Sequence, residues 1–278
     1  MTTIALVFLL ALCVNGEPQP LQAKVDLSGY SRTVLDRDVN NVGKYLGIDL
    51  QHSTSQPAGQ WNRPLLIVPR EVNRVDTIQK LQKLYASEGE NSADVTDFLN
   101  AVVATDVMKH TMDYLRSIGK FSGNQRDFVE LLRRLWFTTY KKGSERSSGF
   151  KHVFMGETKR GLNQKLVNGF HSWVFFAHQQ EKNRIQYKGW HTKKVFNNDK
   201  GSLLSLRFDW NGAFKSYGSM FVGTSPELEM ALYTACFLAA DRLEATCSAN
   251  IGGHNVRIKA VPKNDLNGNL ILTTYPES

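Results

Sequence analysis

The sequence lacks most of the short motifs that identify common enzyme classes. It contains no Gly-x-Ser-x-Gly, no His-Glu-x-x-His and no Cys-x-x-Cys segment, which disfavours serine hydrolases, zinc peptidases and thiol redox proteins. Gly156 and Gly161 have the glycine spacing of a P-loop, but Leu162 and Asn163 follow where that motif requires Lys and Ser or Thr. No internal repeat, low-complexity tract or Asn-x-Ser/Thr sequon is present. Any reactive site must therefore be built from other residues.

Long hydrophobic runs are also missing, apart from a short one at the N-terminus. Ile4–Val14 is apolar over eleven residues, which is too short to cross a bilayer but suits the core of a signal peptide. Small residues follow it, so cleavage is expected near Gly16–Glu17. We therefore predict a signal peptide at residues 1–16, a secreted protein, and no membrane-spanning or membrane-bound segment. The alternative is a buried N-terminal helix.

Cysteine is scarce, with three in 278 residues, so the chain has no disulfide framework of the kind that holds small secreted domains together. Removal of residues 1–16 would leave Cys236 and Cys247, which an oxidising compartment would allow to pair. Both a disulfide and two free thiols stay open. Cys236 is expected on a helix and Cys247 at the start of a strand, and this placement favours two buried thiols.

Positive charge is concentrated in one segment. The formal net charge is +8, and residues 141–200 hold 13 Lys and Arg against 4 Asp and Glu, so this segment supplies the whole basic character. A focused positive field attracts phosphate backbones, heparin-like polymers or anionic lipid. The alternative is a solvated basic face with no partner.

The half of the sequence before residue 140 has the apolar spacing of amphipathic helices. The residues that share a helical face are Leu35, Val39, Val42 and Leu46, then Val95, Phe98, Leu99, Val102 and Val103, and finally Phe128, Leu131, Leu132, Leu135 and Trp136. Asn124 and Asp127 supply the capping residues for the last of these helices. The N-terminal half is therefore predicted to be helical.

After Gly149 the pattern changes to short runs rich in β-branched and aromatic residues. The predicted strands are His171–His178, Leu203–Trp210, Ser219–Val222, Val256–Val261 and Asn269–Tyr275. One helix interrupts them, starting at Thr224-Ser-Pro-Glu227, which combines a hydroxyl cap, an early proline and an acid. Helices followed by strands predict an α+β fold, with a helical N-terminal lobe at about 25–142 and a mainly antiparallel β-rich C-terminal lobe at about 149–278. Gly143–Gly149 is the expected boundary between these lobes, and residues 17–278 are expected to form one domain.

Two histidines in the basic segment are candidates for proton transfer. His152 and His171 each follow a Gly-Phe step. A histidine can give or take a proton near neutral pH, so two of them can serve as base and acid in one displacement. A lysine beside a phosphate can stabilise the charge that develops there. The pattern alone does not bring these side chains together, and each histidine taken singly is expected at the surface or in a hydrogen bond.

Several local strings resemble the EndoU family of uridylate-specific endoribonucleases, which includes the amphibian small-nucleolar-RNA-processing nuclease and placental protein 11. The strings are Ser148-Gly-Phe-Lys-His-Val-Phe-Met-Gly-Glu157, Gly169-Phe-His-Ser-Trp173, Ser219-Met-Phe-Val-Gly-Thr-Ser-Pro-Glu227, Ala231-Leu-Tyr-Thr-Ala-Cys-Phe237 and Leu272-Thr-Thr-Tyr-Pro276. They occur in the family's order, and the resemblance covers residues 25–278. It implies cleavage of single-stranded, uridine-containing RNA, with a 2′,3′-cyclic phosphate and a 5′-hydroxyl as product ends.

The resemblance also implies a role for particular residues. His152 resembles the general acid, His171 the general base and Lys215 the catalytic lysine. Ser219 and Tyr275 resemble the pair that faces the uracil ring. Thr273 matches a further residue of that pocket.

Metal stimulation is a further implication of the resemblance. Animal members of the family are typically stimulated by Mn²⁺ or Ca²⁺, and Glu157 and Asp265 match acidic positions that can help to bind the metal. Lys151 departs from the family, because the residue before the first histidine is commonly acidic. A cation beside His152 opposes its protonation, so the role of this position is open.

Two other functions remain as alternatives. One is a secreted RNA- or polyanion-binding protein with the same fold and little turnover, which the basic segment and Lys151 favour. The other is a secreted hydrolase of proteins, which the missing serine and cysteine motifs disfavour. The intact His152, His171 and Lys215 favour the nuclease, which is expected to act as a monomer.

Overall fold

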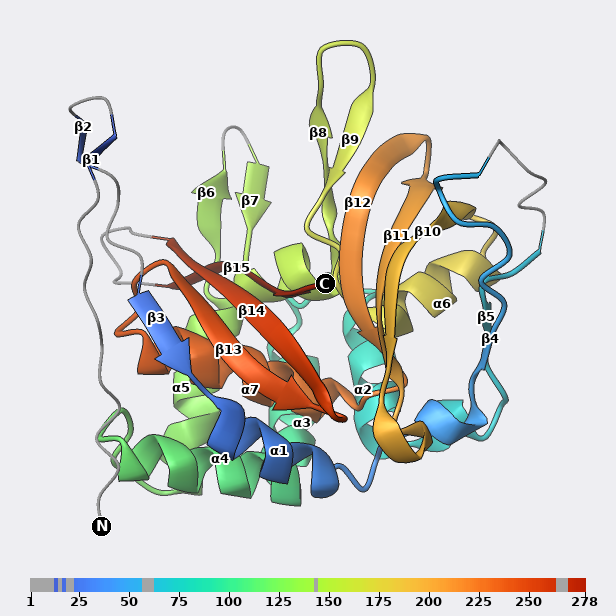
Figure 1. The fold of residues 1–278 in the computed structure, drawn as a ribbon. Coiled ribbons are helices and arrows are strands. Elements are labelled where there is room, and N and C mark those ends of the chain that lie inside the picture. Colours follow the sequence, from blue (N-terminus) through green and yellow to red (C-terminus); the bar gives the residue numbers. More distant parts are fainter. Residues whose placement is uncertain (1–12, 15–16, 19–22, 57–62, 143–144, 264–269) are drawn as a thin grey trace.

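The computed structural model describes residues 13–14, 17–18, 23–56, 63–142, 145–263 and 270–278. Two larger β-sheets, three two-stranded sheets and a layer of helices make up this part of the chain (Figure 1). A five-stranded sheet has the strand order β10-β11-β12-β9-β8, and a four-stranded sheet has the order β15-β14-β13-β3. The strands of the larger sheet are β8 (Glu157–Arg160), β9 (Lys165–Asn168), β10 (Ile185–Val195), β11 (Ser202–Trp210) and β12 (Ala213–Val222). Those of the smaller sheet are β3 (Ala23–Asp26), β13 (Ala245–Ile251), β14 (His254–Lys263) and β15 (Leu270–Glu277).

Most neighbouring strands run antiparallel, and the two parallel pairs are β9 with β12 and β3 with β13. The predicted α+β fold is therefore confirmed. The strands expected in the C-terminal half correspond to β11, β12, β14 and β15. β3, however, comes from the N-terminal end of the described domain and forms an edge of the C-terminal sheet, so the helical half and the β-rich half share a sheet.

The helices of the N-terminal half form the lower layer in Figure 1. They are α1 (Ser28–Asp36), α2 (Asp76–Leu84), α3 (Ser92–Val103), α4 (Asp106–Ser117) and α5 (Gln125–Phe137), with short 3₁₀ turns η1 (Gly43–Tyr45) and η2 (Val72–Arg74). The predicted apolar face of α3 is buried. Asn124 caps α5 in a capping box with Asp127, as expected. None of the helices in the described ranges is long and apolar enough to cross a membrane.

The first predicted helix is shorter than its apolar spacing suggests. α1 ends at Asp36, and Val39 is 78% exposed. Local polar side chains provide the reason, because they hydrogen-bond the backbone in a turn and compete with helical bonding. The amide of Asn41 donates to the carboxylate of Asp38 and its oxygen accepts from the backbone N–H of Gly43. The helix predicted through Leu46 was therefore wrong beyond Asp36.

A central helix, α7 (Pro226–Ala239), is buried along its whole length. It lies behind the four-stranded sheet in Figure 1. The side chain of Ser225 accepts a hydrogen bond from the backbone of Leu228 and so caps the helix, as the sequence predicted. The indole of Trp136 in α5 donates to the hydroxyl of Thr234, 3.0 Å away. α7 thereby joins the helical layer to the smaller sheet.

Cys236 and Cys247 form a disulfide bond. α7 packs against the strands that follow it, and this packing brings the two Cα atoms within 5.8 Å, inside the range that a disulfide requires. The preference for two buried thiols was therefore wrong, because the sequence pattern did not show that the helix and the strand lie side by side.

The segment predicted as a strand at His171–His178 is a helix, α6 (Trp173–Glu181). Val174, Phe175 and Phe176 favour strands by type and are all buried. A helix that is buried on most sides has no amphipathic spacing, so the pattern resembled that of a buried strand. The strand prediction was wrong for this segment.

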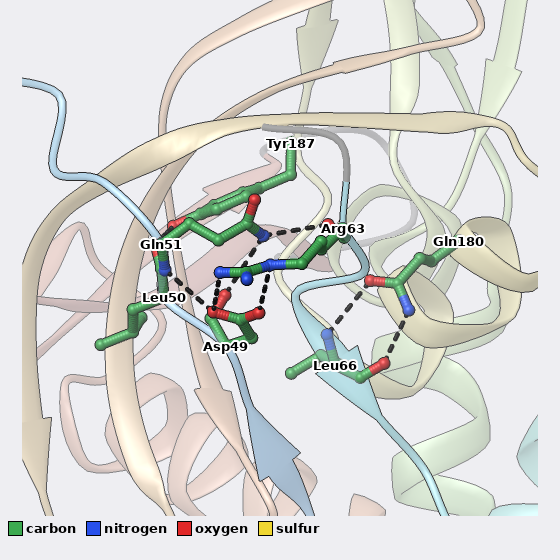
Figure 2. Close-up of polar contacts among 7 residues, drawn as sticks. All are labelled: Asp49, Leu50, Gln51, Arg63, Leu66, Gln180 and Tyr187. Atoms are coloured by element: carbon green, nitrogen blue, oxygen red, sulfur yellow. Dashed lines mark hydrogen bonds and ion pairs between the residues drawn. The ribbon is translucent and has the colours of Figure 1, made fainter. Parts of the chain in front are cut away.

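A segment of the N-terminal half of the chain holds α6 in place. β4 (Gly47–Ile48) pairs with β5 (Leu66–Ile67), and Figure 2 shows the side-chain amide of Gln180 bonded to both the N–H and the C=O of Leu66, at 3.1 and 2.7 Å. The hydroxyl of Tyr187 in β10 donates to the carbonyl of Leu50 in the same view. Residues 47–67, as far as they are described, therefore fix the helix that follows His171.

The remaining elements are short. They are β1 (Cys13–Val14) with β2 (Glu17–Pro18), β6 (Tyr140–Lys142) with β7 (Glu145–Ser147), the π-helical turn η3 (Lys151–Met155) and the 3₁₀ turn η4 (Asn197–Asp199). The segment expected to separate the lobes, Gly143–Gly149, therefore contains a strand, β7, which pairs with β6 in a hairpin. The predicted signal peptide, residues 1–16, lies outside the described residues except for Cys13–Val14.

Candidate active site

A hollow of about 510 Å³ lies between the two sheets, within the range of about 300–1,000 Å³ that small-molecule sites occupy. Six side chains selected from the sequence line it. They are His152, His171, Lys215, Ser219, Thr273 and Tyr275. These residues come from η3, from the turn before α6, from β12 and from β15. The fold therefore brings together residues that are up to 123 positions apart in the sequence, from His152 to Tyr275.

His152 is buried and paired with a carboxylate. Its Nδ1 lies 2.9 Å from Oε2 of Glu157, which is also buried. Gly156, with φ of 91°, makes the sharp turn between them, and a Cβ there would lie 2.7 Å from Cβ of Phe170. Since a carboxylate accepts, Nδ1 carries the proton in this pair, and the bond fixes the orientation and tautomer of the ring. Glu157, expected as a metal ligand, thus contacts His152.

Backbone hydrogen bonds tie the second histidine to the first. Phe170 N donates to the carbonyl of His152 at 3.0 Å, and His171 N donates to the carbonyl of Val153 at 2.7 Å. Gly169 has φ of 68°, and a Cβ on it would lie 1.9 Å from the carbonyl oxygen of His152. Only glycine fits such an approach. The Gly-Phe step before His171 therefore sets the spacing of the two histidine segments.

His171 is held as a neutral imidazole. Its Nδ1 lies 2.8 Å from the main-chain carbonyl of Ser219, and since a carbonyl only accepts, Nδ1 is the donor and Nε2 carries the lone pair. Burial lowers the pKa of His171 well below its usual 6.5, and the charge of Lys215 lowers it further. The Ser219 carbonyl opposes this shift. The ring stacks on Tyr275, with ring centroids 4.7 Å apart.

Lys215 lies on β12 and reaches the turn before His171. Its Nζ donates to the carbonyl of Gly169 at 2.7 Å. Burial, with the nearby charge of Lys159, lowers the pKa of Lys215 to about 8. The ammonium group is therefore mostly protonated at neutral pH, and it contributes a positive charge in a poorly solvated position.

Two strands present the remaining predicted residues. Side chains two apart on a strand share a face, which places Thr273 and Tyr275 on one side of β15. On β12 a bulge in the pairing with β11 lies between Lys215 and Ser219, and both residues line the hollow. Ser219 is 3% exposed. The hydroxyl of Thr273 is buried and has no hydrogen-bond partner among the described residues. Such a group is ready to bond a polar ligand.

Lys151, whose role the sequence left open, has an acidic partner in the fold. Its ammonium group pairs with Glu88, in the turn between α2 and α3. The cation is therefore matched by an acid from the helical half. The described residues contain no group of three or more His, Cys, Asp or Glu side chains that could hold a metal ion. Asp265, the other predicted metal residue, lies outside the described ranges.

Part of the predicted basic segment lies near this hollow. The hairpin β8–β9 carries Lys159 and Arg160, which are exposed, and it projects above the sheets in Figure 1. Lys159 is near enough to lower the pKa of Lys215. Other cations of the segment are paired, as Lys188 is with Asp209 and Lys200 with an acid of α1.

The sequence interpretation missed five polar or aromatic residues of the hollow. They are Asn168, Tyr217, Arg257, Glu277 and Ser278. Strand alternation could have identified Tyr217, because it lies two positions before Ser219 on β12. Arg257 and Glu277 form an ion pair, with Nε 3.2 Å from Oε2, and only the register of β14 with β15 brings them together.

Comparisons with known proteins identify the family of this chain. The family model described as Endoribonuclease XendoU matches residues 26–276. The uridylate-specific endoribonuclease EndoU of Drosophila melanogaster is 39% identical over 191 residues, which are 68% of this chain and 58% of that protein. Poly(U)-specific endoribonuclease-B of Xenopus laevis is 36% identical over 192 residues, 67% of this chain and 63% of that protein. The matches thus span less than two thirds of these curated relatives.

A solved structure has the same fold. The structure of XendoU, described as a splicing independent snoRNA processing endoribonuclease, superposes with a TM-score of 0.72 and 31% sequence identity. The match covers 90% of this chain and 96% of that one. The family match includes all six predicted residues of the hollow. The chain therefore belongs to the XendoU family, which is the EndoU family that its sequence strings resemble.

Proposed function

We propose that this protein is a secreted endoribonuclease that cleaves single-stranded RNA at uridylates. The 2′-hydroxyl of the uridine attacks the adjacent phosphorus, and the bond from phosphorus to the 5′-oxygen of the next nucleotide breaks. The products end in a 2′,3′-cyclic phosphate and a 5′-hydroxyl. The observation that carries the proposal is the pairing, in one hollow, of a neutral histidine with a carboxylate-bound histidine beside a buried lysine.

His171 serves as the base in this mechanism. Its Nδ1 is bonded to the carbonyl of Ser219, so Nε2 accepts the proton of the 2′-hydroxyl. A lowered pKa keeps this nitrogen unprotonated at neutral pH. The nucleophile belongs to the substrate, which agrees with the absence of serine and cysteine nucleophile motifs.

His152 serves as the acid. The carboxylate of Glu157, 2.9 Å from Nδ1, stabilises the protonated ring, because an opposite charge favours the charged form. The proton on Nε2 passes to the leaving 5′-oxygen. Lys215 stabilises the extra negative charge on the phosphate oxygens in the transition state, and its buried position strengthens that interaction.

Uracil selection is assigned to Ser219, Thr273 and Tyr275. The hydroxyls of Ser219 and Thr273 can bond the ring oxygens and the imide N–H of uracil. Tyr275 already stacks on His171 with one face, so a uracil ring would use its opposite face. This arrangement would hold the base on one face of Tyr275, with the histidine that activates its ribose on the other face.

Stimulation by Mn²⁺ or Ca²⁺ remains a prediction. Glu157 contacts His152, Asp265 lies outside the described residues, and no suitable group of ligands occurs among the residues that are described. No step above depends on a metal. Cleavage by protein dialysed against EDTA, with and without each added cation, tests the prediction.

Secretion and a monomeric state also remain predictions. The apolar N-terminal run and the disulfide between Cys236 and Cys247 both suit an oxidising compartment outside the cytosol. Sequencing of the N-terminus of protein recovered from culture medium tests cleavage near Gly16. Sedimentation measures the oligomeric state.

The decisive experiment for the activity uses two oligonucleotides that carry a single uridine. One has a ribose at that position and the other has 2′-deoxyuridine. The first should be cut after the uridine to leave a cyclic phosphate, and the second should be bound but not cut. Equal cleavage of both would overturn the mechanism. Binding of both without any cleavage would favour the alternative, an RNA-binding protein without turnover.

A further inference from the structure

Tyr217 is an exposed aromatic residue inside a polar hollow. It lies on β12, two positions from Lys215 and two from Ser219, and it lines the candidate active site. Its side chain is 48% exposed, whereas Lys215 and Ser219, which line the same hollow, are largely buried. The mechanism proposed above gives it no role. A flat, accessible ring beside a nucleotide site is the kind of surface on which a base can stack.

The ring is held in a fixed position. Its hydroxyl lies 2.7 Å from the hydroxyl of Ser278, and the ring packs against His191, with centroids 4.8 Å apart. His191 is itself bonded at both nitrogens, to the hydroxyl of Thr54 and to the carbonyl of Ser216, each at 2.8 Å. A preorganised ring loses little entropy when a base stacks on it.

A second hollow continues from the first. It has a volume of about 700 Å³ and shares Arg257, Glu277 and Ser278 with the candidate active site. Lys194 lines its far part and donates to the carbonyl of Asn255 at 2.9 Å. Tyr217 contacts the shared wall through Ser278, so a strand that leaves the uridine pocket across Tyr217 would enter this second hollow.

The charges of the second hollow are nearly balanced. Its cations are Lys194 and Arg257, and its acids are Asp26 and Glu277. Attraction of phosphates should therefore be weak there compared with the hairpin that carries Lys159 and Arg160. Stacking on an aromatic ring does not need a net positive charge, and it tolerates any base.

We propose that Tyr217 is the stacking platform of a second nucleotide subsite, which binds the base of a nucleotide flanking the cleaved uridylate and directs the strand past Arg257 into the second hollow. The inference rests on the proposed nuclease function and adds a residue to its substrate site. Ser219 would decide which base is cut. Tyr217 would raise the efficiency of cutting without regard to the identity of the flanking base.

The test combines a change in the protein with a change in the RNA. Five-nucleotide RNAs carry one uridine, and each other position in turn is made abasic. With the unchanged protein, removal of the base at one flanking position should lower kcat/KM about 5- to 150-fold, the equivalent of roughly 1–3 kcal/mol per stacked base. Tyr217→Ala should lower kcat/KM for the intact RNA by a similar factor. The kcat/KM of this variant should then not fall further when the base at that one position is missing.

Two further variants separate stacking from structure. Tyr217→Phe removes the bond to Ser278 but keeps the ring, so the penalty for the missing base should remain. Tyr45→Ala is the matched control, because Tyr45 is 55% exposed in η1 and lines neither hollow. It should behave like the unchanged protein.

The Kd of each protein for each of these RNAs is also measured by fluorescence anisotropy, with 2′-deoxyuridine in place of the uridine. This binding cycle does not depend on turnover. If removal of a base changes kcat/KM and Kd by the same factor in Tyr217→Ala as in the unchanged protein, at every position, the subsite is wrong. The cleavage activity would still stand after that result. If no RNA is cleaved but the binding cycle shows the coupling, the subsite stands and the proposed nuclease function fails.

Discussion

Glu157 and His152 form a buried pair in which a carboxylate oxygen lies 2.9 Å from Nδ1 of the ring. Glu157 is five residues after His152, beyond a glycine turn, and it points back to the histidine. The negative charge of Glu157 stabilises the protonated form of His152 more than an uncharged neighbour would.

The first prediction removes this charge while keeping the hydrogen bond. In Glu157→Gln the amide oxygen can still accept from Nδ1, but the protonated ring loses its counter-charge. The cleavage rate should fall roughly 10- to 100-fold, as is common when a residue that orients a functional histidine is changed. In the pH profile of kcat, the decline at high pH should begin at a lower pH for this variant than for the unchanged protein. A pH profile of kcat identical in shape to that of the unchanged protein would show that Glu157 has only a packing role.

The second prediction concerns His171 and pH. Burial and the charge of Lys215 lower its pKa well below 6.5, so the base stays active as the pH falls through that value. The acid side of the profile of kcat/KM should therefore decline only well below pH 6.5. His171→Ala should lose roughly 10²–10⁴-fold in rate with little change in RNA binding. A decline centred at pH 6.5 or above would contradict the assignment of His171 as the base.

A third prediction distinguishes Lys215 from the surface cations. Lys215→Met keeps the length of the side chain and removes its charge, so turnover should fall even at saturating RNA, because the charge acts mainly in the transition state. The pKa of about 8 for Lys215 in the free protein predicts a decline of the unchanged enzyme's kcat/KM as the pH rises through 8.

Reversal of the exposed charges Lys159 and Arg160 is the comparison for Lys215→Met. The reversal should raise KM. It should also reduce the slope of the logarithm of RNA affinity against the logarithm of salt concentration by about 0.7 for each lost phosphate contact on a single strand. If Lys215→Met changes only KM, that lysine belongs with the phosphate contacts.

The fourth prediction addresses base preference. Ser219→Ala leaves the main-chain carbonyl that holds His171 intact, so only the hydroxyl is tested. Its loss should narrow the preference for uridine over cytidine by about 5- to 150-fold, which corresponds to the cost of roughly 1–3 kcal/mol for an unmatched buried polar group. Thr273→Val provides the parallel test of the second hydroxyl with the side-chain shape kept. Unchanged base preference in both variants would remove these residues from uracil recognition.

The fifth prediction concerns the bond between Cys236 and Cys247. A closed loop of this length stabilises a fold by roughly 2–4 kcal/mol, through restriction of the unfolded chain. The double change to alanine should lower the free energy of unfolding by about that amount in urea titrations. Addition of reductant should shift the unfolding midpoint of the unchanged protein and leave the double variant unaffected. The absence of any effect of reductant would contradict the disulfide.

Elements with a clear apolar period could be predicted from the sequence. The helices α3 and α5 were correct because each buries one face against the core and exposes the other, and Asn124 with Asp127 marked the start of α5. α6 was missed because nearly all of its apolar residues are buried, which erases the period. α1 was extended too far because Val39 continued the spacing after polar side chains had already turned the backbone.

The candidate site depended on two kinds of information. The family resemblance identified His152, His171 and Lys215, and no periodic pattern could have shown that they meet. Tyr217 and the Arg257–Glu277 pair needed the strand register. The disulfide needed the packing of α7. Each of these depends on contacts between distant segments, which the local sequence does not encode in a readable form.

The parallel pairing of β3 with β13 has a consequence for the synthesis of this protein. Ala23 pairs with Ala245, so β3 leaves the ribosome 222 residues before its partner, and at about 5–20 residues per second it waits roughly 10–45 s. Thr273 and Tyr275 leave later still, on β15. An unfinished chain therefore has no complete pocket, and the ability to cleave RNA should arise only after the last strand, β15, has been made and paired.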